Sequence, residues 1–172
     1  RMINIGCGSV DFNLKLARHS DDVTCIDISK KMINEVQKKL YQEQIFYINF
    51  ICADIMSYRP ILKYDVVFAN FFLNTFNWSD CQKVLHHLSS FVNEDGLLCI
   101  ADETIGEKWY VKMIQTLLRP IIVFFHYLWT GHPSHHIFDY DLIILNLGFV
   151  KKQEVRDKCG YILSTIYQKR RI

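Results

Sequence analysis

The chain alternates short apolar runs with longer stretches in which apolar residues recur at helical spacing. Five apolar runs bounded by turn-forming residues predict β-strands, at residues 2–5, 23–26, 45–52, 64–69 and 97–101. Three amphipathic stretches predict α-helices, at residues 10–18, 30–42 and 80–92. Ser29 directly precedes the second helix and is a suitable N-cap. Strands that alternate with helices are typical of an α/β fold with a mainly parallel sheet.

After the fifth strand the sequence becomes more apolar and more aromatic. Residues 105–130 predict a long helix that is interrupted at Pro120. Residues 139–146 predict a further helix, which Gly148 ends.

Two final apolar runs, at residues 150–155 and 161–167, predict strands. The turn between them, residues 156–160, is short enough for a hairpin. We therefore expect one domain over residues 1–172, built on a doubly wound, mainly parallel seven-stranded sheet that ends in a C-terminal antiparallel hairpin.

Composition narrows the class of protein. The chain has 172 residues, of which 50% are hydrophobic, so it can bury a core and is not disordered. Its 20 Lys and Arg nearly balance its 18 Asp and Glu, which argues against nucleic acid as a partner. The chain opens with Arg-Met and enters an apolar run at once. We therefore expect an N-terminal segment to be absent, so targeting cannot be judged from this sequence.

The cysteines favour a cytoplasmic or other reducing compartment. Their spacing matches neither a zinc site nor a redox pair, and several fall within apolar runs, at residues 7, 25, 52, 81, 99 and 159. We expect them to be reduced core thiols.

The strongest chemical signal is a strand that runs into Gly6-Cys7-Gly8 and then into a helix. Glycines let the backbone approach a ligand closely, and the helix N-terminus adds N–H donors. Asp27 ends the second strand, where a carboxylate can accept hydrogen bonds from a ribose diol. Asp54 ends the third strand, where it can accept an adenine amino group.

At these residues the chain resembles a class I S-adenosylmethionine-dependent methyltransferase, and the resemblance covers almost all of its length. Residues 64–70 resemble the fourth strand of this family, and residues 93–102 resemble its turn and fifth strand. The resemblance implies a Rossmann-like methyltransferase fold with S-adenosyl-L-methionine as cofactor. The cofactor-binding residues it implies are Asn4, Gly6, Cys7, Gly8, Asp27, Ile28, Asp54, Ile55, Asn70 and Phe71.

Two residues depart from the family pattern. The family usually has an acidic residue where this chain has Asn4, and a third loop glycine where it has Val10. An amide can still hydrogen-bond to the methionine end of the cofactor, but it adds no charge attraction. A nicotinamide dehydrogenase is disfavoured, because its fingerprint also needs the third glycine.

Residues 105–138 form an insert that, by the resemblance, roofs the substrate site. The insert is aromatic and aliphatic, but polar residues and Pro120 interrupt it too often for a membrane span. Such a roof suits a hydrophobic acceptor, including one taken from a membrane surface. A core-packing helix and an oligomer interface are the alternatives. The candidate acceptor-binding residues are Phe72, Asn74, Trp109 and Tyr110.

Four histidines lie close together, at positions 126, 132, 135 and 136. Their spacing matches no tetrahedral zinc pattern, so we predict no metal site. His126 and His135 are candidate general bases for an acceptor that must lose a proton.

Within the family, the chain looks most similar to ubiquinone and menaquinone methyltransferases and to the related rhodoquinone-biosynthesis protein. We expect methyl transfer to a small hydrophobic acceptor, quinone-like or aromatic, with peripheral membrane contact as a possible partner interaction. Two alternatives stay open. One is rhodoquinone biosynthesis, in which the cofactor donates an amino group to ubiquinone. The other is a non-catalytic cofactor-binding module. The oligomeric state is not predicted.

Overall fold

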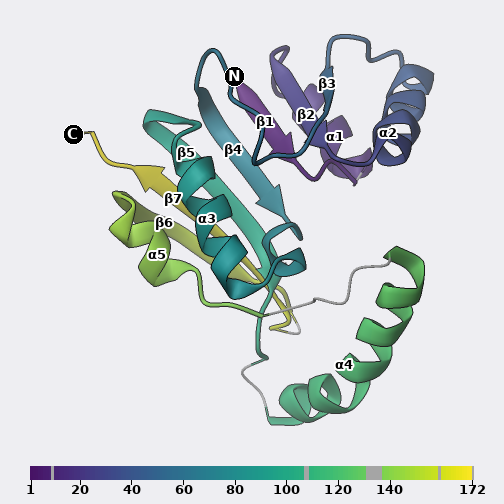
Figure 1. Cartoon of the computed structure of the whole chain (residues 1–172), viewed down its shortest axis with the longest axis vertical. Coiled ribbons are helices and arrows are strands. Elements are labelled where there is room, and N and C mark those ends of the chain that lie inside the picture. The colour runs from purple at the N-terminus through teal and green to yellow at the C-terminus, as the bar shows by residue number, and fades with distance from the viewer. Residues whose placement is uncertain (9, 107–108, 131–136, 159, 172) are drawn as a thin grey trace.

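The computed structural model describes residues 1–8, 10–106, 109–130, 137–158 and 160–171, and it describes the side chains of all these residues except 119, 122 and 125–130. Within these ranges the chain forms a seven-stranded sheet with helices on both faces (Figure 1). The strands are β1 (Met2–Ile5), β2 (Val23–Asp27), β3 (Asn49–Cys52), β4 (Tyr64–Asn70), β5 (Val92–Glu103), β6 (Phe149–Arg156) and β7 (Ile162–Lys169). The helices are α1 (Val10–Ala17), α2 (Lys30–Gln42), the 3-10 turn η1 (Leu73–Thr75), α3 (Trp78–Ser89), α4 (Trp109–Thr130) and α5 (Asp141–Asn146).

The strand order is β3-β2-β1-β4-β5-β7-β6. The first five strands are parallel, whereas β7 runs antiparallel to both β5 and β6. This arrangement confirms the predicted doubly wound sheet with its C-terminal hairpin. Because the parallel strands share one direction, the loops that follow β1, β2, β3 and β4 all meet at the same edge of the sheet.

The core has one hydrophobic cluster on each face of the sheet. Side chains alternate between the faces along each strand, so Ile3 and Ile5 join the cluster beneath α3 and α5. Val23 and Cys25 join the second cluster, which packs against α1 and α2. The two clusters hold the parallel strands rigidly, and the loops at the strand ends are therefore positioned by a packed core.

Several predicted boundaries differ from the structure by a few residues, and those of β3, α3 and β5 differ most clearly. β3 begins at Asn49 rather than residue 45, and α3 ends at Ser89, so that β5 already begins at Val92. The turn expected at the start of residues 93–102 lies inside β5, beside an irregularity in the pairing of β5 with β4. Asn93 Nδ2 donates to Asp65 Oδ1 at 2.8 Å, which holds the irregular segment against β4.

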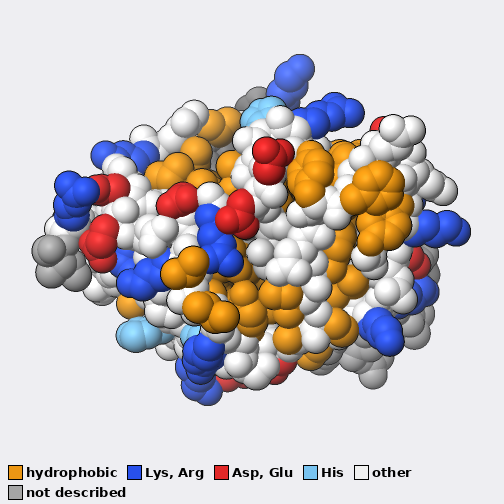
Figure 2. Space-filling view, turned by 90° about the horizontal axis from the view of Figure 1, so that it is seen from above, with side chains coloured by type: hydrophobic (Ala, Val, Ile, Leu, Met, Phe, Trp, Pro, Cys, Tyr) orange, Lys and Arg blue, Asp and Glu red, His pale blue; other side chains and the backbone are white. Residues whose placement is uncertain are grey.

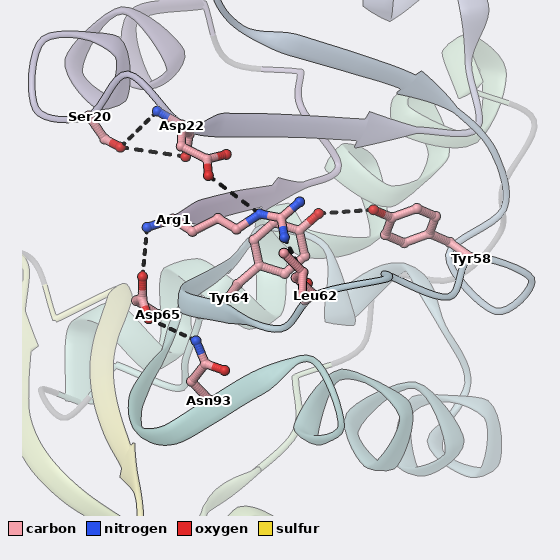
Figure 3. A network of polar contacts seen from close by, with 8 residues as sticks. All are labelled: Arg1, Ser20, Asp22, Tyr58, Leu62, Tyr64, Asp65 and Asn93. Carbon is pink, nitrogen blue, oxygen red and sulfur yellow. Dashed lines mark hydrogen bonds and ion pairs between the residues drawn. The ribbon is translucent and has the colours of Figure 1, made fainter.

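Arg1 fixes the amino end of β1 (Figure 3). Its guanidinium lies 4.8 Å from the centre of the Tyr64 ring and donates to the Leu62 carbonyl oxygen at 3.2 Å. The Tyr64 hydroxyl lies 2.9 Å from that of Tyr58.

The same end of the molecule carries a band of hydrophobic side chains (Figure 2), and Ile61, in the loop before β4, is 99% exposed. This end lies opposite the strand ends that carry the glycine loop.

Helix α4 extends beyond the edge of the sheet to which β1 and β4 point (Figure 1). The helix continues through Pro120 instead of being interrupted there, and it bends along its length. Among the described parts of the chain, no helix combines the length and the apolar character that crossing a membrane requires.

Candidate functional site

The glycine loop, Asp27 and Asn70 lie at the carboxyl ends of the neighbouring strands β1, β2 and β4. Ile5 pairs with Ile26 in β2 and with Ala69 in β4, so the residues that follow these three lie at one level. Gly6 also donates its N–H to the Ile26 carbonyl at 2.9 Å, which ties the loop to β2. The structure thus brings together the ends of β1, β2 and β4, which carry the predicted residues Gly6, Asp27 and Asn70.

Gly6 is required by both backbone conformation and space. Its φ of +71° lies in the left-handed region, which favours glycine. A Cβ atom at this position would lie 2.9 Å from Cδ2 of Phe72, closer than packed carbon atoms approach. Gly8 donates its N–H to the Gly6 carbonyl at 2.9 Å and is exposed, so its backbone is open to a ligand.

Asp27 begins the turn into α2. Its Oδ1 accepts a hydrogen bond from the Ser29 N–H at 2.8 Å, and Ser29 Oγ in turn accepts from the Met32 N–H, which confirms Ser29 as N-cap. A carboxylate can accept about four hydrogen bonds, so most of this capacity is open to a ribose diol. The neighbouring Ile28 is 72% exposed, as a residue lying over a bound nucleoside would be.

Asp54 and Ile55 lie beyond β3, next to Asp27. The Ala53 N–H donates to the Asp27 carbonyl at 3.0 Å and joins the two strand ends. Asp54 is exposed, and its Oδ1 accepts from the Met56 N–H at 2.9 Å. Ile55 is buried in the core, so its backbone rather than its side chain can meet a ligand.

Asn4 and Cys7 support the loop from beneath. Asn4 is buried, and its Nδ2 donates to Asn13 Oδ1 at 2.8 Å, while Asn13 Nδ2 donates to the Cys7 carbonyl at 2.9 Å. Burial, reinforced by the negative charge of Asp27, raises the pKa of the Cys7 thiol to about 12, so this thiol stays protonated. A direct contact of Asn4 with the cofactor stays a prediction.

Phe71 and Phe72 form the wall between the glycine loop and β5. Phe71 adopts a φ of +51°, which is uncommon for a residue with a side chain, and its ring is 48% exposed. Its N–H donates to the Ala101 carbonyl at 2.8 Å, while Asn70 pairs with Ala101 in the sheet. Phe72 packs over Gly6 and meets Phe76 edge to face, with 5.1 Å between ring centres.

A buried polar cluster lies on the other side of this wall. Asp102, at the end of β5, is 3% exposed, and its Oδ2 accepts from the Tyr140 hydroxyl at 2.9 Å and from the Asn74 N–H at 3.2 Å. Burial raises the pKa of the Asp102 carboxyl to about 6, against the lowering effect of the hydrogen bonds it accepts from Glu103, Tyr140 and Asn74. The Asn74 side chain is fully buried, and neither of its polar atoms has a hydrogen-bond partner among the described residues.

Asp102 and Tyr140 line a cavity of about 530 Å³. Its walls come from β5, β6 and β7 and from residues 137–141, which lead into α5. Lys151 lies in this wall and forms ion pairs with Asp141 and Glu154. The cavity therefore lies one strand away from the cofactor loops, and both apolar and charged residues line it. Asp102 and Tyr140 were not singled out from the sequence, although an acidic residue directly after an apolar strand was a usable signal.

The remaining predicted residues lie on α4 or outside the described residues. Trp109 and Tyr110 begin α4 and are 75% and 43% exposed. The side chain of His126 and the whole of His135 lie outside the described residues, as do His132 and His136. In the described part of the chain, no three His, Cys, Asp or Glu side chains are grouped as metal ligands.

Known proteins are similar to the first half of this chain in sequence and to nearly all of it in fold. A family profile described as methyltransferase domain matches residues 2–96. The chain is 34% identical over 119 residues to malonyl-[acyl-carrier protein] O-methyltransferase 2 of Ilyobacter polytropus, a match that covers 67% of this chain and 43% of the relative. It is 24% identical over 173 residues to the malonyl-[acyl-carrier protein] O-methyltransferase of a Paenibacillus species, covering 97% and 56%. The chain thus spans about half the length of these relatives.

Solved structures share the fold at lower sequence identity. The magnesium protoporphyrin IX methyltransferase of Synechocystis with bound S-adenosyl-homocysteine superposes with a TM-score of 0.75 at 20% identity, covering 98% of this chain and 73% of that one. The N-methyltransferase NodS of Bradyrhizobium japonicum, also bound to S-adenosyl-homocysteine, gives 0.71 at 15% identity, covering 98% and 76%.

Proposed function

We propose that this chain transfers the methyl group of S-adenosyl-L-methionine to a small acceptor with a hydrophobic body. The chain belongs to the methyltransferase domain family, and this family uses S-adenosyl-L-methionine as cofactor. The observation that carries the proposal is the shared edge of β1, β2 and β4. There, a glycine in the left-handed conformation, the carboxylate of Asp27 and the exposed Phe71 lie at neighbouring strand ends.

The residues of this edge fit the cofactor they are proposed to hold. The backbone of the glycine loop would receive its methionine part, Asp27 its ribose, and the segment at Asp54 its adenine. When bound, the cofactor supplies a methyl group already activated on a sulfonium, so the protein mainly aligns the acceptor for in-line transfer. The backbone of Asn70 and Phe71, which is bonded to the end of β5, would line the sulfonium on the side that faces the acceptor.

The exposed apolar face of α4 supports a hydrophobic, quinone-like or aromatic acceptor. Among the described side chains of the helix, eight large hydrophobic ones are at least 43% exposed: Trp109, Tyr110, Met113, Ile114, Leu117, Leu118, Ile121 and Phe124. The helix begins beside the end of β5, where Gln115 Nε2 donates to the Thr104 carbonyl at 2.9 Å. A hydrophobic acceptor could therefore pass along α4 toward the cavity at that strand end.

A membrane surface is the partner we propose for this face. Residues 109–130 contain no Asp or Glu, whereas Lys112 and Arg119 are basic, a balance that favours anionic lipid. Leu117→Glu should reduce cosedimentation with phosphatidylserine vesicles without changing cofactor affinity. Ile61→Glu, at the opposite end of the molecule, is the matched control. Equal vesicle binding by all three proteins would contradict membrane contact through α4.

The curated relatives favour a second acceptor, the free carboxyl of a malonyl group on a carrier protein. The comparisons give no support to amino transfer in rhodoquinone biosynthesis. To test the proposed function, the chain is incubated with S-adenosylmethionine and either a short-chain hydroxyquinol or malonyl-carrier protein. Mass spectrometry then follows S-adenosyl-homocysteine and the methylated product. Methyl transfer to either compound supports a methyltransferase. Cofactor binding without any transfer would indicate a non-catalytic module.

A further inference from the structure

The acceptor cavity contains a carboxylate that is held in place from three directions. Glu103 N–H donates to Asp102 Oδ1 at 2.8 Å, and the other oxygen accepts from Tyr140 and from the Asn74 backbone. A carboxylate accepts about four hydrogen bonds, so Asp102 has capacity for one more. It lines the cavity, where that capacity is available to a bound acceptor.

The residues next to Asp102 contact those that flank the proposed position of the methyl group. The preceding residue, Ala101, pairs with Asn70 and accepts the N–H of Phe71. Asn74, which donates to Asp102, belongs to the short turn that follows Phe72. The Asp102 carboxylate therefore accepts directly from the turn that follows Phe72, while the residue before it, Ala101, is bonded to Phe71.

Resting on the proposed function, we propose that Asp102 is the general base of the reaction and that the acceptor presents a hydroxyl or amine to it. The acceptor oxygen or nitrogen forms its bond to the methyl carbon while the carbon–sulfur bond breaks. The acceptor's proton moves to the Asp102 carboxylate, which becomes neutral. The products are the methylated acceptor, S-adenosyl-homocysteine and protonated Asp102, which later releases its proton to solvent.

Burial makes this carboxylate suited to the role. A pKa raised to about 6 lies near neutral pH, where a base can both hold its charge and accept a proton. Tyr140 and Tyr167 face the same cavity with pKa values raised by burial and by neighbouring carboxylates, so both stay protonated. Cys81 packs from α3, and its thiol pKa is likewise raised by burial and by the charge of Asp102.

The charges around Asp102 also bear on the acceptor class. The other charged groups that line the cavity are Glu103, Asp139, Asp141, Lys151, Glu154 and Arg156. With Asp102 they amount to five carboxylates against two cations, and Lys151 is already paired with Asp141 and Glu154. An anionic acceptor would be repelled here, whereas a neutral hydroxyl or an amine would be favoured.

Two variants test the base. With the hydroxyquinol as acceptor, wild-type kcat/KM should rise with pH through about pH 6, and Asp102→Asn should lower it by about 100-fold or more and abolish that rise. Tyr140→Phe removes a hydrogen bond that stabilises the ionised carboxylate, so the rise should move to higher pH. A purely structural role of Asp102 would produce neither change in the pH profile.

Glu94→Gln is the matched control, because it removes an exposed carboxylate from the same strand, β5, outside the cavity. We expect it to keep the wild-type profile, and we expect all variants to bind S-adenosylmethionine with unchanged affinity by calorimetry. An unchanged profile in Asp102→Asn would overturn the proposal while leaving the proposed function intact. Methylation of malonyl-carrier protein alone would also overturn it, since a carboxylate acceptor has no proton to lose. Failure of the wild-type chain to transfer a methyl group to either acceptor would instead refute the proposed function and, with it, this inference.

Discussion

The hydroxyl of Tyr140 donates a hydrogen bond to the carboxylate of Asp102, 2.9 Å away, and joins the start of α5 to the end of β5. The same carboxylate accepts from the backbone of Asn74, in the turn that leads away from the cofactor loops. One buried charge thus connects three segments that line or approach the acceptor cavity. A buried charge lowers the stability of the fold, and titratable groups buried in this way cluster at functional sites.

That cost predicts how stability depends on pH. The folded-state pKa of Asp102 lies above its ordinary value of 3.8, at about 6, so the folded protein binds the proton more tightly than the unfolded chain. Its stabilising contribution is fully present below about pH 4 and is lost as the pH rises through about 6, which amounts to about 3 kcal/mol. Urea unfolding should show that the difference in unfolding free energy between the wild type and Asp102→Asn changes by about 3 kcal/mol as the pH rises from about 4 through about 6. A pH-independent difference would show that Asp102 titrates normally.

Gly6→Ala should reduce both stability and cofactor affinity. The alanine would have to adopt a φ of +71°, and its Cβ would lie 2.9 Å from the Phe72 ring. We therefore expect the free energy of unfolding to fall by about 2 kcal/mol and S-adenosylmethionine to bind at least about 10-fold more weakly. Gly148→Ala is the control, because Gly148 also has a positive φ but has nothing within 4 Å of the added atom. It should lose about 1 kcal/mol and keep its affinity. Equal losses of stability and affinity in the two variants would show that the contact with Phe72 has no effect of its own.

Asp27→Ala should weaken cofactor binding by about 100-fold or more, because two charge-assisted hydrogen bonds to the ribose are removed. Asp27→Asn keeps an oxygen for the Ser29 N–H and should lose less. Ser29→Ala controls for the helix cap, since it should cost about 1 kcal/mol of stability at unchanged affinity. Calorimetry and thermal unfolding on the three variants separate these effects. Unchanged affinity in Asp27→Ala would exclude this residue from the site.

Asn4→Asp should destabilise the protein and weaken cofactor binding. The new carboxylate would face Asn13 Oδ1, which now accepts from the Asn4 amide at 2.8 Å in the buried core. We expect a loss of about 2 kcal/mol from a buried charge without a partner. Asn49→Asp introduces the same charge at an exposed position and serves as the control. Tighter binding by Asn4→Asp would instead place Asn4 beside the ammonium group of the cofactor.

The hydrophobic pattern was sufficient to predict the sheet, because its strands are short, apolar and separated by clear turn signals. Met2–Ile5 and Val23–Asp27 lie within one residue of the predicted strands. The glycine loop and Asp27 were also predictable, since a turn with a positive φ needs glycine and the register places the two strand ends together. Asn49–Cys52 is shorter than predicted because periodicity alone does not show where pairing with β2 begins.

The acceptor side could not be predicted in the same way. Asp102 and Tyr140 are 38 residues apart, and only the folding of β5 against the segment before α5 brings them together. The histidines attracted attention as candidate bases because their ordinary pKa lies near neutrality. A carboxylate whose pKa rises through burial leaves no such mark in a sequence. Pro120 suggested an interruption, but the helix absorbs it by bending.

Calorimetric titration of the chain with S-adenosylmethionine, with NAD as the control ligand, tests the central claim most directly. The arrangement of Gly6, Asp27 and Phe71 at neighbouring strand ends predicts one-site binding of S-adenosylmethionine and no heat of binding with NAD. A folded protein that binds NAD, or that binds neither compound, would contradict it.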